Sequence, residues 1–532
     1  MTTVLARRKQ WALVIHDGMR VNALPHPCQA VARHSKGQRE SDQYRREGFA
    51  ILRPTVIMKR VVVVTLILCA SLLGAWPSKQ VTFTPYDDAK PILDTLVEIA
   101  PGELRCGVAN CGEATWNAWV VKRDTEIRAR LAQGDADTVV NFLMFGTSFT
   151  RAPRLTGEQL RALSSGTNAT TVDVATSSSR TLLDKRIEDL IAAMNVRRAN
   201  ERLEFAKKTL EAAGIDFLQP TAAHNARTYL IANVDRVLRE QAGFEQVLAE
   251  AKNLNDATEE FAEVSKLYKD RGLSLDTSLP PNFAIEETLR EMREDGLLTP
   301  NSIKRIGVIG PGLDFTDKHE GYDFYPVQTV QPFAVADSVL RFGLGKPEYL
   351  EVDVLDLSPR VLRHANSLAA GAAQGKPYTI QLTLDEARGW QPKLVRYWRH
   401  FGDQVGVTEK PAVVPARLKR VTLRAVSVRS QLARRMKSFD LDVILQRAVF
   451  EKDDDKFDLL IATNILVYYD TFEQALALSN IAAMLKPGGY LLANNLLLEL
   501  PGSQMRSAGH VSVKYSEKET DGDTIVKYRR MK

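Results

Sequence analysis

The sequence predicts an α/β protein in which a doubly wound, mostly parallel sheet occupies the C-terminal half and a mainly α-helical region precedes it. Three observations lead to this prediction. Apolar runs typical of buried strands alternate with helical stretches between about 299 and 505. A glycine turn directly follows the first of these runs. Before them, apolar residues recur at helical spacing over most of 181–298.

The length and composition predict several globular domains. The chain has 532 residues, too many for one ordinary core. Apolar residues make up 44% and charged residues 26%, and the net charge of +6 is too small to indicate nucleic-acid binding by itself. The predicted regions are an irregular basic extension (1–57), a signal peptide or membrane anchor (58–77), a mixed region with loops (78–180), a helical domain (181–298), the sheet domain (299–505) and a C-terminal tail (506–532).

A short basic segment, Met58-Lys59-Arg60, precedes an apolar run from Val61 to Trp76. This order is typical of a secretory signal peptide, and the run is short for a transmembrane helix, which needs roughly 20 residues. We therefore expect the natural start at Met58 and export of the protein. The alternatives are a single-span inner-membrane anchor with a cytoplasmic tail, or a buried strand or helix in a cytoplasmic protein.

The cysteines do not predict a metal site. Of Cys28, Cys69, Cys106 and Cys111, only the last two are close in sequence, and no second pair of cysteines or histidines follows nearby. A disulfide between Cys106 and Cys111 would need an oxidising compartment. Two separate thiols are the simpler interpretation.

The first predicted strand, Ile306–Ile309, leads into Gly310-Pro311-Gly312. A glycine turn after a buried strand allows the backbone to approach a cofactor closely. The complete dinucleotide fingerprint needs a third small residue, but Phe315 occupies that place. The turn therefore indicates either a nucleotide cofactor or a tight turn without a ligand.

The second predicted strand, Tyr349–Leu357, places Asp356 at its carboxyl end, where a carboxylate can accept both ribose hydroxyls of a nucleoside. Ser358-Pro359 then begins a predicted helix, so that Asp356 could instead only cap that helix. Asp356 lies farther from the glycines than the roughly 20 residues typical of NAD sites. The inserted loop 313–330 accounts for part of this excess.

Three ordered segments resemble class I S-adenosylmethionine-dependent methyltransferases, which have a Rossmann-like sheet. They are the Asp-Leu-Ser-Pro step at 356–359, the strand and following segment at 457–470, and the helix-turn-strand at 484–492. The part from Ile465 to Asp470 is similar to the chemotaxis-receptor methyltransferases. The resemblance covers roughly 304–498, less than half of the chain.

The resemblance implies S-adenosylmethionine as the cofactor and assigns roles to five residues. Gly310 and Gly312 would flank its methionine part, and Asp356 would hold its ribose. Asp442 would contact the adenine amine. Asn464 would end the fourth strand beside the point of methyl transfer, where it is the candidate catalytic residue.

Other residues compete with these assignments or depart from the family pattern. Asp385, which follows the strand-like run Tyr378–Leu384, is an alternative to Asp442. Val308 stands where the family usually has an acid. The first helix, Gln331–Leu344, begins only after the polar loop 313–330. This loop could form a lid in which His319 acts as a general base, or it could be a simple exposed loop.

An insertion at 386–438 separates the second-strand and fourth-strand elements. Its part 417–437 contains eight basic residues and no acid. A solvated basic face is the simpler interpretation, contact with an anionic or membrane surface is the alternative, and nucleic acid is not expected.

The leading hypothesis is an S-adenosylmethionine-dependent methyltransferase, an enzyme that needs orientation and desolvation more than a catalytic triad or a metal. The alternatives are an NAD-dependent oxidoreductase and a non-catalytic exported or membrane-tethered protein with a degenerate cofactor domain.

Overall fold

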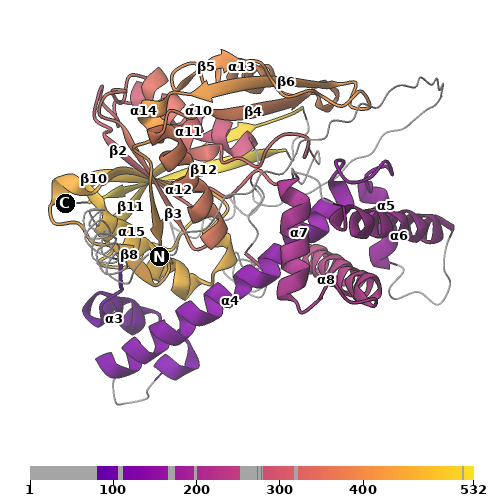
Figure 1. Cartoon of the computed structure of the whole chain (residues 1–532). Coiled ribbons are helices and arrows are strands. Elements are labelled where there is room, and N and C mark those ends of the chain that lie inside the picture. The colour runs from indigo at the N-terminus through magenta and orange to yellow at the C-terminus, as the bar shows by residue number, and fades with distance from the viewer. Residues whose placement is uncertain are drawn as a thin grey trace, which may run out of the picture. The chain divides into compact units, whose positions relative to one another are not determined.

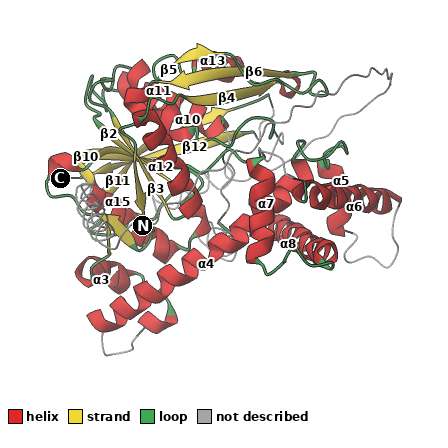
Figure 2. Cartoon of the chain, in the orientation of Figure 1, coloured by secondary structure: helices red, strands yellow, loops and turns green. Residues whose placement is uncertain are grey.

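A computed structural model describes residues 81–105, 112–165, 174–196, 200–251, 272–273, 277, 279–316, 322–517 and 521–531. These residues belong to one structural unit. The helices between about residues 157 and 251 and the strands after about residue 305 occupy separate parts of it (Figure 2).

The main sheet has seven strands in the order β11-β12-β10-β9-β2-β3-β7. Its strands are β2 (Arg305–Ile309), β3 (Glu351–Asp356), β7 (Lys437–Asp440), β9 (Phe457–Ala462), β10 (Leu485–Ala493), β11 (Met505–Lys514) and β12 (Gly522–Arg530). The first five are parallel to one another, whereas β12 pairs antiparallel with both β10 and β11. From β2 the chain proceeds to β3 and β7 on one side, and β9 and β10 then lie on the other side. The order therefore reverses between β2 and β9.

Helices cover both faces of this sheet. Successive side chains of β9 pack alternately against the helices of one face and those of the other. Leu459 and Ile461 belong to one hydrophobic cluster, which also contains residues of α10, α11 and α12. Leu460 and Ala462 belong to a second cluster with α3 and α15. Because side chains of a strand alternate between faces, two covered faces require apolar residues at every position. The predicted α/β doubly wound fold is confirmed. The helices are α3 (Tyr86–Thr95), α10 (Pro280–Glu294), α11 (Gln331–Arg341), α12 (Pro359–Ala373) and α15 (Thr471–Met484).

The predicted C-terminal tail, 506–532, is wrong, because β11 and β12 form a hairpin that completes the sheet. The edge strand β11 leaves most of its side chains exposed or half-buried. It therefore lacks the apolar run by which the buried strands were recognised. In β12 only the stretch Ile525–Tyr528 is buried.

The insertion builds a sheet of its own. The strands β4 (Tyr378–Asp385), β6 (Val421–Val428) and β5 (Gly406–Glu409) are antiparallel and separate from the main sheet. The short helices of this part are α13 (Pro392–His400) and α14 (Ser430–Ala433). The predicted strand at Tyr378–Leu384 is confirmed, but it does not reach the cofactor edge of the main sheet.

The helical region consists of α4 (Glu113–Phe145), α5 (Gly157–Ser165), α6 (Val174–Met194), α7 (Glu201–Ala212) and α8 (Ala222–Ala251), which pack together at one end of α4 (Figure 1). Gly214 follows α7 with φ of 88°, a conformation typical of a C-terminal cap. Cys106, Cys111 and the segment 58–77 lie outside the described residues.

The 33-residue helix α4 was not predicted, because 78–180 was interpreted as a mixed region with loops. Its two halves bury different surfaces. Trp116 and Trp119 pack in the cluster of α15, whereas Phe142 and Leu143 pack in the other cluster. A helix that changes partners along its length has no single apolar stripe, which is the pattern that helix prediction needs.

Two buried charged residues fix the loop 313–330 to the helical region. Arg202 of α7 is 3% exposed and donates to the carbonyl oxygens of Phe315, Tyr325 (2.5 Å) and Asp314 (3.2 Å). Asp323, also 3% exposed, accepts hydrogen bonds from residues 147 and 148 after α4. The loop therefore has a defined path on both sides of its undescribed segment, 317–321.

Among the described residues, no helix has both the length and the apolar character needed to cross a bilayer.

The remaining elements are short. The strands β1 (Val81–Phe83) and β8 (Gln446–Ala448) pair with each other, and the single-turn helices are η1 (Gly102–Leu104), η2 (Glu386–Arg388), η3 (Asp453–Asp455) and η4 (Leu466–Tyr468).

A buried ion pair between α4 and α15 gives a first prediction. Arg123 Nε lies 2.7 Å from Glu473 Oε1, and Glu473 is 2% exposed. We expect Arg123→Met to destabilise the protein by about 3–5 kcal/mol, because it leaves a buried carboxylate without its partner. The denaturant midpoint measures this loss. The double variant Arg123→Met/Glu473→Gln should recover most of it, since both charges are then removed. An unchanged midpoint in the single variant would contradict the structural role of the pair.

Candidate functional site

The candidate site is a small cleft at the carboxyl edge of the main sheet, where the strand order reverses. It is lined by residues that follow four parallel strands: Gly310 and Gly312 after β2, Leu355–Ser358 at the end of β3, Leu441 and Val443 after β7, and Ile465, Tyr468 and Tyr469 after β9. In open α/β sheets, ligands bind at this reversal of strand order. The cleft has a volume of about 70 Å³.

The glycine turn after β2 has the backbone that only glycine adopts easily. Gly310 and Gly312 have φ of 60° and 63°. A Cβ on Gly310 would collide with the side chain of Ile465, and the Gly310 N–H donates to the Leu355 carbonyl at 2.8 Å. Both glycines line the cleft, and their contact with the methionine part of a cofactor remains a prediction. The side chain of Ile465, which lies against Gly310, was not among the predicted site residues.

Asp356 stands at the floor of the same cleft, as predicted. It is half-buried, and one carboxylate oxygen accepts the N–H of Ser358 at 2.7 Å. Burial raises the pKa of Asp356 to about 7, although the backbone hydrogen bonds oppose this shift. Ser358 begins α12 without capping it through its side chain. The carboxylate therefore has one oxygen bound to the backbone and retains acceptor capacity toward the cleft.

Asp442 lies next to the cleft but its side chain does not line it, whereas its neighbours Leu441 and Val443 do. One carboxylate oxygen accepts the N–H of Ile444 at 2.9 Å, and the other is buried with no hydrogen-bond donor among the described residues. Burial raises the pKa of Asp442 to about 7, and the nearby carboxylate of Asp124 on α4 adds to the shift. Its contact with an adenine amine remains a prediction.

Asp385 is the acid that competed with Asp442, and it lies at the end of β4 in the separate sheet. There its side chain accepts the N–H of Ala387. The structure thus brings Gly310, Gly312 and Asp356 together in one cleft and excludes Asp385 from it.

Asn464 follows β9 with φ of 59°, a left-handed conformation that is uncommon for a residue other than glycine. Its N–H donates to the side chain of Asn494 at 2.8 Å, and the Asn494 amide donates back at 2.5 Å. Asn494, which directly follows β10, was not among the predicted site residues. The polar pair Asn494-Asn495 after an apolar run was the available signal.

The helical region contributes a wall that sequence reasoning missed. Leu131 of α4 and Leu273 line the cleft opposite the sheet. Arg130 donates to the Tyr468 carbonyl at 3.2 Å and lies 5.5 Å from the centre of the Tyr469 ring. The cleft is therefore closed by α4 as well as by Ile465.

The polar loop 313–330 folds back beside the glycine turn. Asp314 accepts hydrogen bonds from the Tyr325 hydroxyl (2.9 Å) and the Gln328 amide (2.8 Å). The helix α11 then begins at Gln331, whose side chain donates to the Thr463 hydroxyl at 2.8 Å. His319 lies outside the described residues, so its role as a general base remains a prediction.

The basic segment 417–437 mostly supports the fold of its own surroundings. Arg424 donates to the carbonyls of residues 398 and 401, Arg429 to that of Gln404, and Arg435 to that of Pro347. Tyr397, Trp398 and Phe401 of the insertion are buried and so offer no stacking surface, whereas Trp390 is half-buried beneath Arg388. Contact with an anionic surface remains a prediction.

Within the part of the chain that the structure describes, no cluster of histidine, cysteine and carboxylate side chains could hold a metal ion. Val308, which stands where the resemblance led us to expect an acid, is fully buried in β2. No acid of the chain therefore occupies that position.

Comparisons with known proteins gave distant structural similarity only. No model of a protein family matches the chain, and no curated protein does. Among solved structures, a magnesium protoporphyrin IX methyltransferase from Synechocystis PCC 6803 with bound SAM is 10% identical, with a TM-score of 0.24 over 47% of this chain and 79% of that one. The mitomycin 7-O-methyltransferase MmcR is 14% identical, with a TM-score of 0.25 over 78% and 98%. Human N-acetylserotonin methyltransferase in complex with SAM is 10% identical, with a TM-score of 0.21 over 80% and 100%. The function must therefore be argued from the residues of this site.

Proposed function

We propose that the chain is an S-adenosylmethionine-dependent methyltransferase. The observation that carries this proposal is the meeting of Gly310, Gly312, Asp356 and the segment after β9 in one cleft at the reversal of strand order. Asp356 and the segment after β9 belong to sequence segments that resemble the family, and the glycine turn lies far from both in the chain.

The donor set of the cleft suits a nucleoside. Asp356 offers a carboxylate oxygen that can accept hydrogen bonds from ribose hydroxyls. The Ile465 side chain fills the space beside Gly310, so a ligand at the glycine turn would displace it. The cofactor supplies an electrophilic methyl group when it is bound. The chain would orient it against the acceptor and exclude water, and α4 and Ile465 already cover the cleft.

The order of the sheet argues against an NAD-dependent oxidoreductase. A dinucleotide-binding sheet continues after its fifth strand with another parallel strand. Here β12 pairs antiparallel with β10, and it separates β10 from β11. The glycine turn also lacks its third small residue, since Phe315 is buried at that place. We therefore rank this alternative below methyl transfer.

A non-catalytic role has one specific observation in its favour. Ligand pockets usually have volumes of about 300–1,000 Å³, whereas this cleft holds only about 70 Å³. Cofactor binding requires Ile465, Leu131 or Leu273 to move away from the glycine turn. If these side chains stay in place, the domain is a degenerate cofactor domain that does not bind S-adenosylmethionine. Export of the chain through the predicted signal at 58–77 would be consistent with such a non-catalytic role.

The finer similarity to the chemotaxis-receptor methyltransferases rests on residues 465–470. Asp470 forms a capping box with Glu473 at the start of α15, and Ile465 packs on Gly310. These contacts give the two residues roles in the fold. We therefore extend the proposal to the broader class and not to that family.

The role of Asp356 can be tested by calorimetry with S-adenosylmethionine and NAD. The wild type should bind S-adenosylmethionine and not NAD. We expect Asp356→Ala to weaken S-adenosylmethionine binding about tenfold to a hundredfold, because hydrogen bonds from ribose to a carboxylate are lost. Asp385→Ala is the matched control and should bind as the wild type does. Absence of S-adenosylmethionine binding in the wild type would reject the proposal.

The pH dependence of binding gives an independent test. The ribose hydroxyls need the ionised carboxylate, and burial raises the pKa of Asp356 to about 7 in the free protein. We expect affinity about tenfold lower at pH 6 than at pH 8. Asp356→Asn should remove this dependence. Titration of the cofactor affects both proteins equally, so the difference between them is the quantity to measure.

The same raised pKa has a consequence for folding. The folded protein holds the Asp356 proton above pH 4, where an unfolded chain releases it. This group therefore makes the folded state less stable as the pH rises from about 4 to about 7. The free energy of unfolding should therefore change differently with pH in the wild type and in Asp356→Asn between about pH 4 and pH 7. Equal pH profiles would contradict the burial of the carboxyl group.

A further inference from the structure

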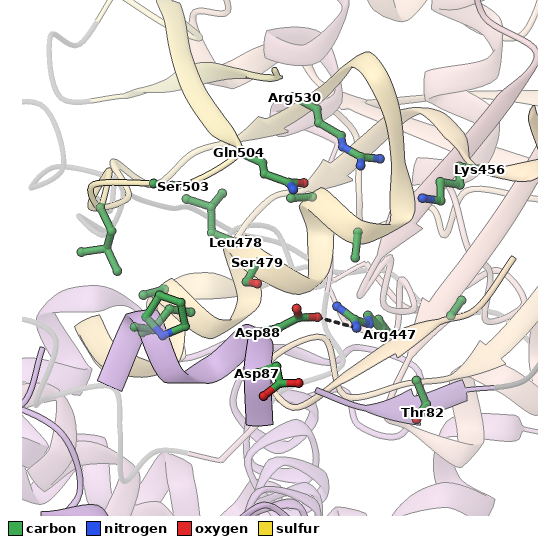
Figure 3. Close-up of a pocket in the computed structure, with 18 of the residues that line it drawn as sticks. Thr82, Asp87, Asp88, Arg447, Lys456, Leu478, Ser479, Ser503, Gln504 and Arg530 are labelled. Atoms are coloured by element: carbon green, nitrogen blue, oxygen red, sulfur yellow. Dashed lines mark ion pairs between the residues drawn. The ribbon is translucent and has the colours of Figure 1, made fainter. Parts of the chain in front are cut away.

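A second and larger cavity lies at the opposite end of the strands from the candidate cofactor cleft. It has a volume of about 650 Å³, within the range of about 300–1,000 Å³ usual for small-molecule sites. Its walls come from α3, β8, α15, the segment 498–504 and Arg530 (Figure 3). Lys456 precedes β9 and Arg530 ends the antiparallel β12, so both lie at the amino ends of the parallel strands.

The floor of this cavity is apolar. Ala475, Leu478 and Ala482 are spaced three and four residues apart, and they therefore lie on one face of α15. Leu500 and Phe450 add apolar surface from two other segments. A ligand that fills the cavity must cover this surface, which favours an apolar body.

The charges of the cavity are unequally neutralised. Arg447 forms an ion pair with Asp88 across the wall at 2.6 Å (Figure 3). Lys456 pairs at 2.8 Å with Asp453, which is 68% exposed and does not line the cavity. Arg530 forms no ion pair with the described residues. Its Nη1 donates to the Leu485 carbonyl, and its Nε has no hydrogen-bond partner among them.

Two of the three cationic groups that line the cavity, Arg530 and Lys456, lie on one side of it, and the acids Asp87 and Asp88 lie with Arg447 on the other. Figure 3 shows Arg530 and Gln504 close together, with Lys456 on the same side of the cavity and the Asp88–Arg447 pair on the other. Guanidinium and amide N–H groups are the donors that recognise carboxylate and phosphate oxygens. An apolar floor that ends in such donors fits a molecule with an apolar body and a single anionic head.

We propose that this cavity binds an amphipathic anion, with its carboxylate or phosphate at Arg530 and Lys456 and its apolar part over α15. This inference is independent of methyl transfer, because the cavity and the cofactor cleft share no residue.

The test is calorimetric titration of the full chain with decanoate, decyl phosphate and decanol, each below its aggregation concentration. We expect at least one anion to bind with one-to-one stoichiometry and about tenfold more tightly than decanol. The two anions distinguish a carboxylate from a phosphate head. Equal affinity for decanol and both anions, or no binding of either anion, would overturn the proposal.

Variants locate the site. Arg530→Gln should weaken binding of the preferred anion about tenfold, and Arg530→Lys, which keeps the charge, should retain most of it. Arg529→Gln is the matched control, since the neighbouring Arg529 is exposed and lies over the Tyr490 ring outside the cavity.

A second variant does not depend on charge. Ser479 of α15 lines the cavity and is only half-buried, so Ser479→Phe should fill the space without disturbing the core. We expect it to abolish anion binding while the unfolding transition stays unchanged. Undiminished binding in both Arg530→Gln and Ser479→Phe would place the ligand elsewhere and reject the proposal.

Discussion

The arrangement around the candidate site depends on the buried guanidinium of Arg202. Removing this group from water is unfavourable unless its donors are satisfied. Here three carbonyls of one loop satisfy them, those of Asp314, Phe315 and Tyr325. The Asp314 and Phe315 carbonyls come before the segment 317–321 of this loop, and the Tyr325 carbonyl comes after it. A single side chain of α7 therefore fixes both the start of the loop at the glycine turn and its return toward α11.

The loop 313–330 also connects the helical region to the sheet domain. The loop that Arg202 holds also receives the hydrogen bonds to Asp323 from the end of α4. At its other side α4 supplies Leu131 to the cleft and Arg123 to α15. The cleft is therefore enclosed by residues whose positions are set by the helical region, although its chemistry comes from the strand ends.

Much of this fold could be predicted from sequence, and the exceptions have physical causes. The strand β9 and the helix α12 were recognised because burial on both faces, or on one helical face, produces a regular apolar pattern. The edge strand β11 has little burial and so no such pattern. The helix α4 was missed because its two halves contact different partners.

The candidate site was predictable to a similar extent. Gly310, Gly312 and Asp356 were found because a strand end and a turn leave a local signal. Ile465, Leu131 and Asn494 were missed, since their importance comes from long-range contacts with ordinary apolar or amide side chains. Asp385 was an alternative to Asp442 for the adenine contact, because the apolar pattern of a strand does not reveal which sheet the strand joins.

The continuity of α4 has a consequence for how such a protein can diversify. One unbroken run of backbone hydrogen bonds connects the cluster around Trp119 with the cluster around Phe142. An exchange of the helical region for another would cut through this helix and expose both clusters. The helical region and the sheet are thus coupled through one helix, and replacing either would require rebuilding the cluster that the other half of α4 fills.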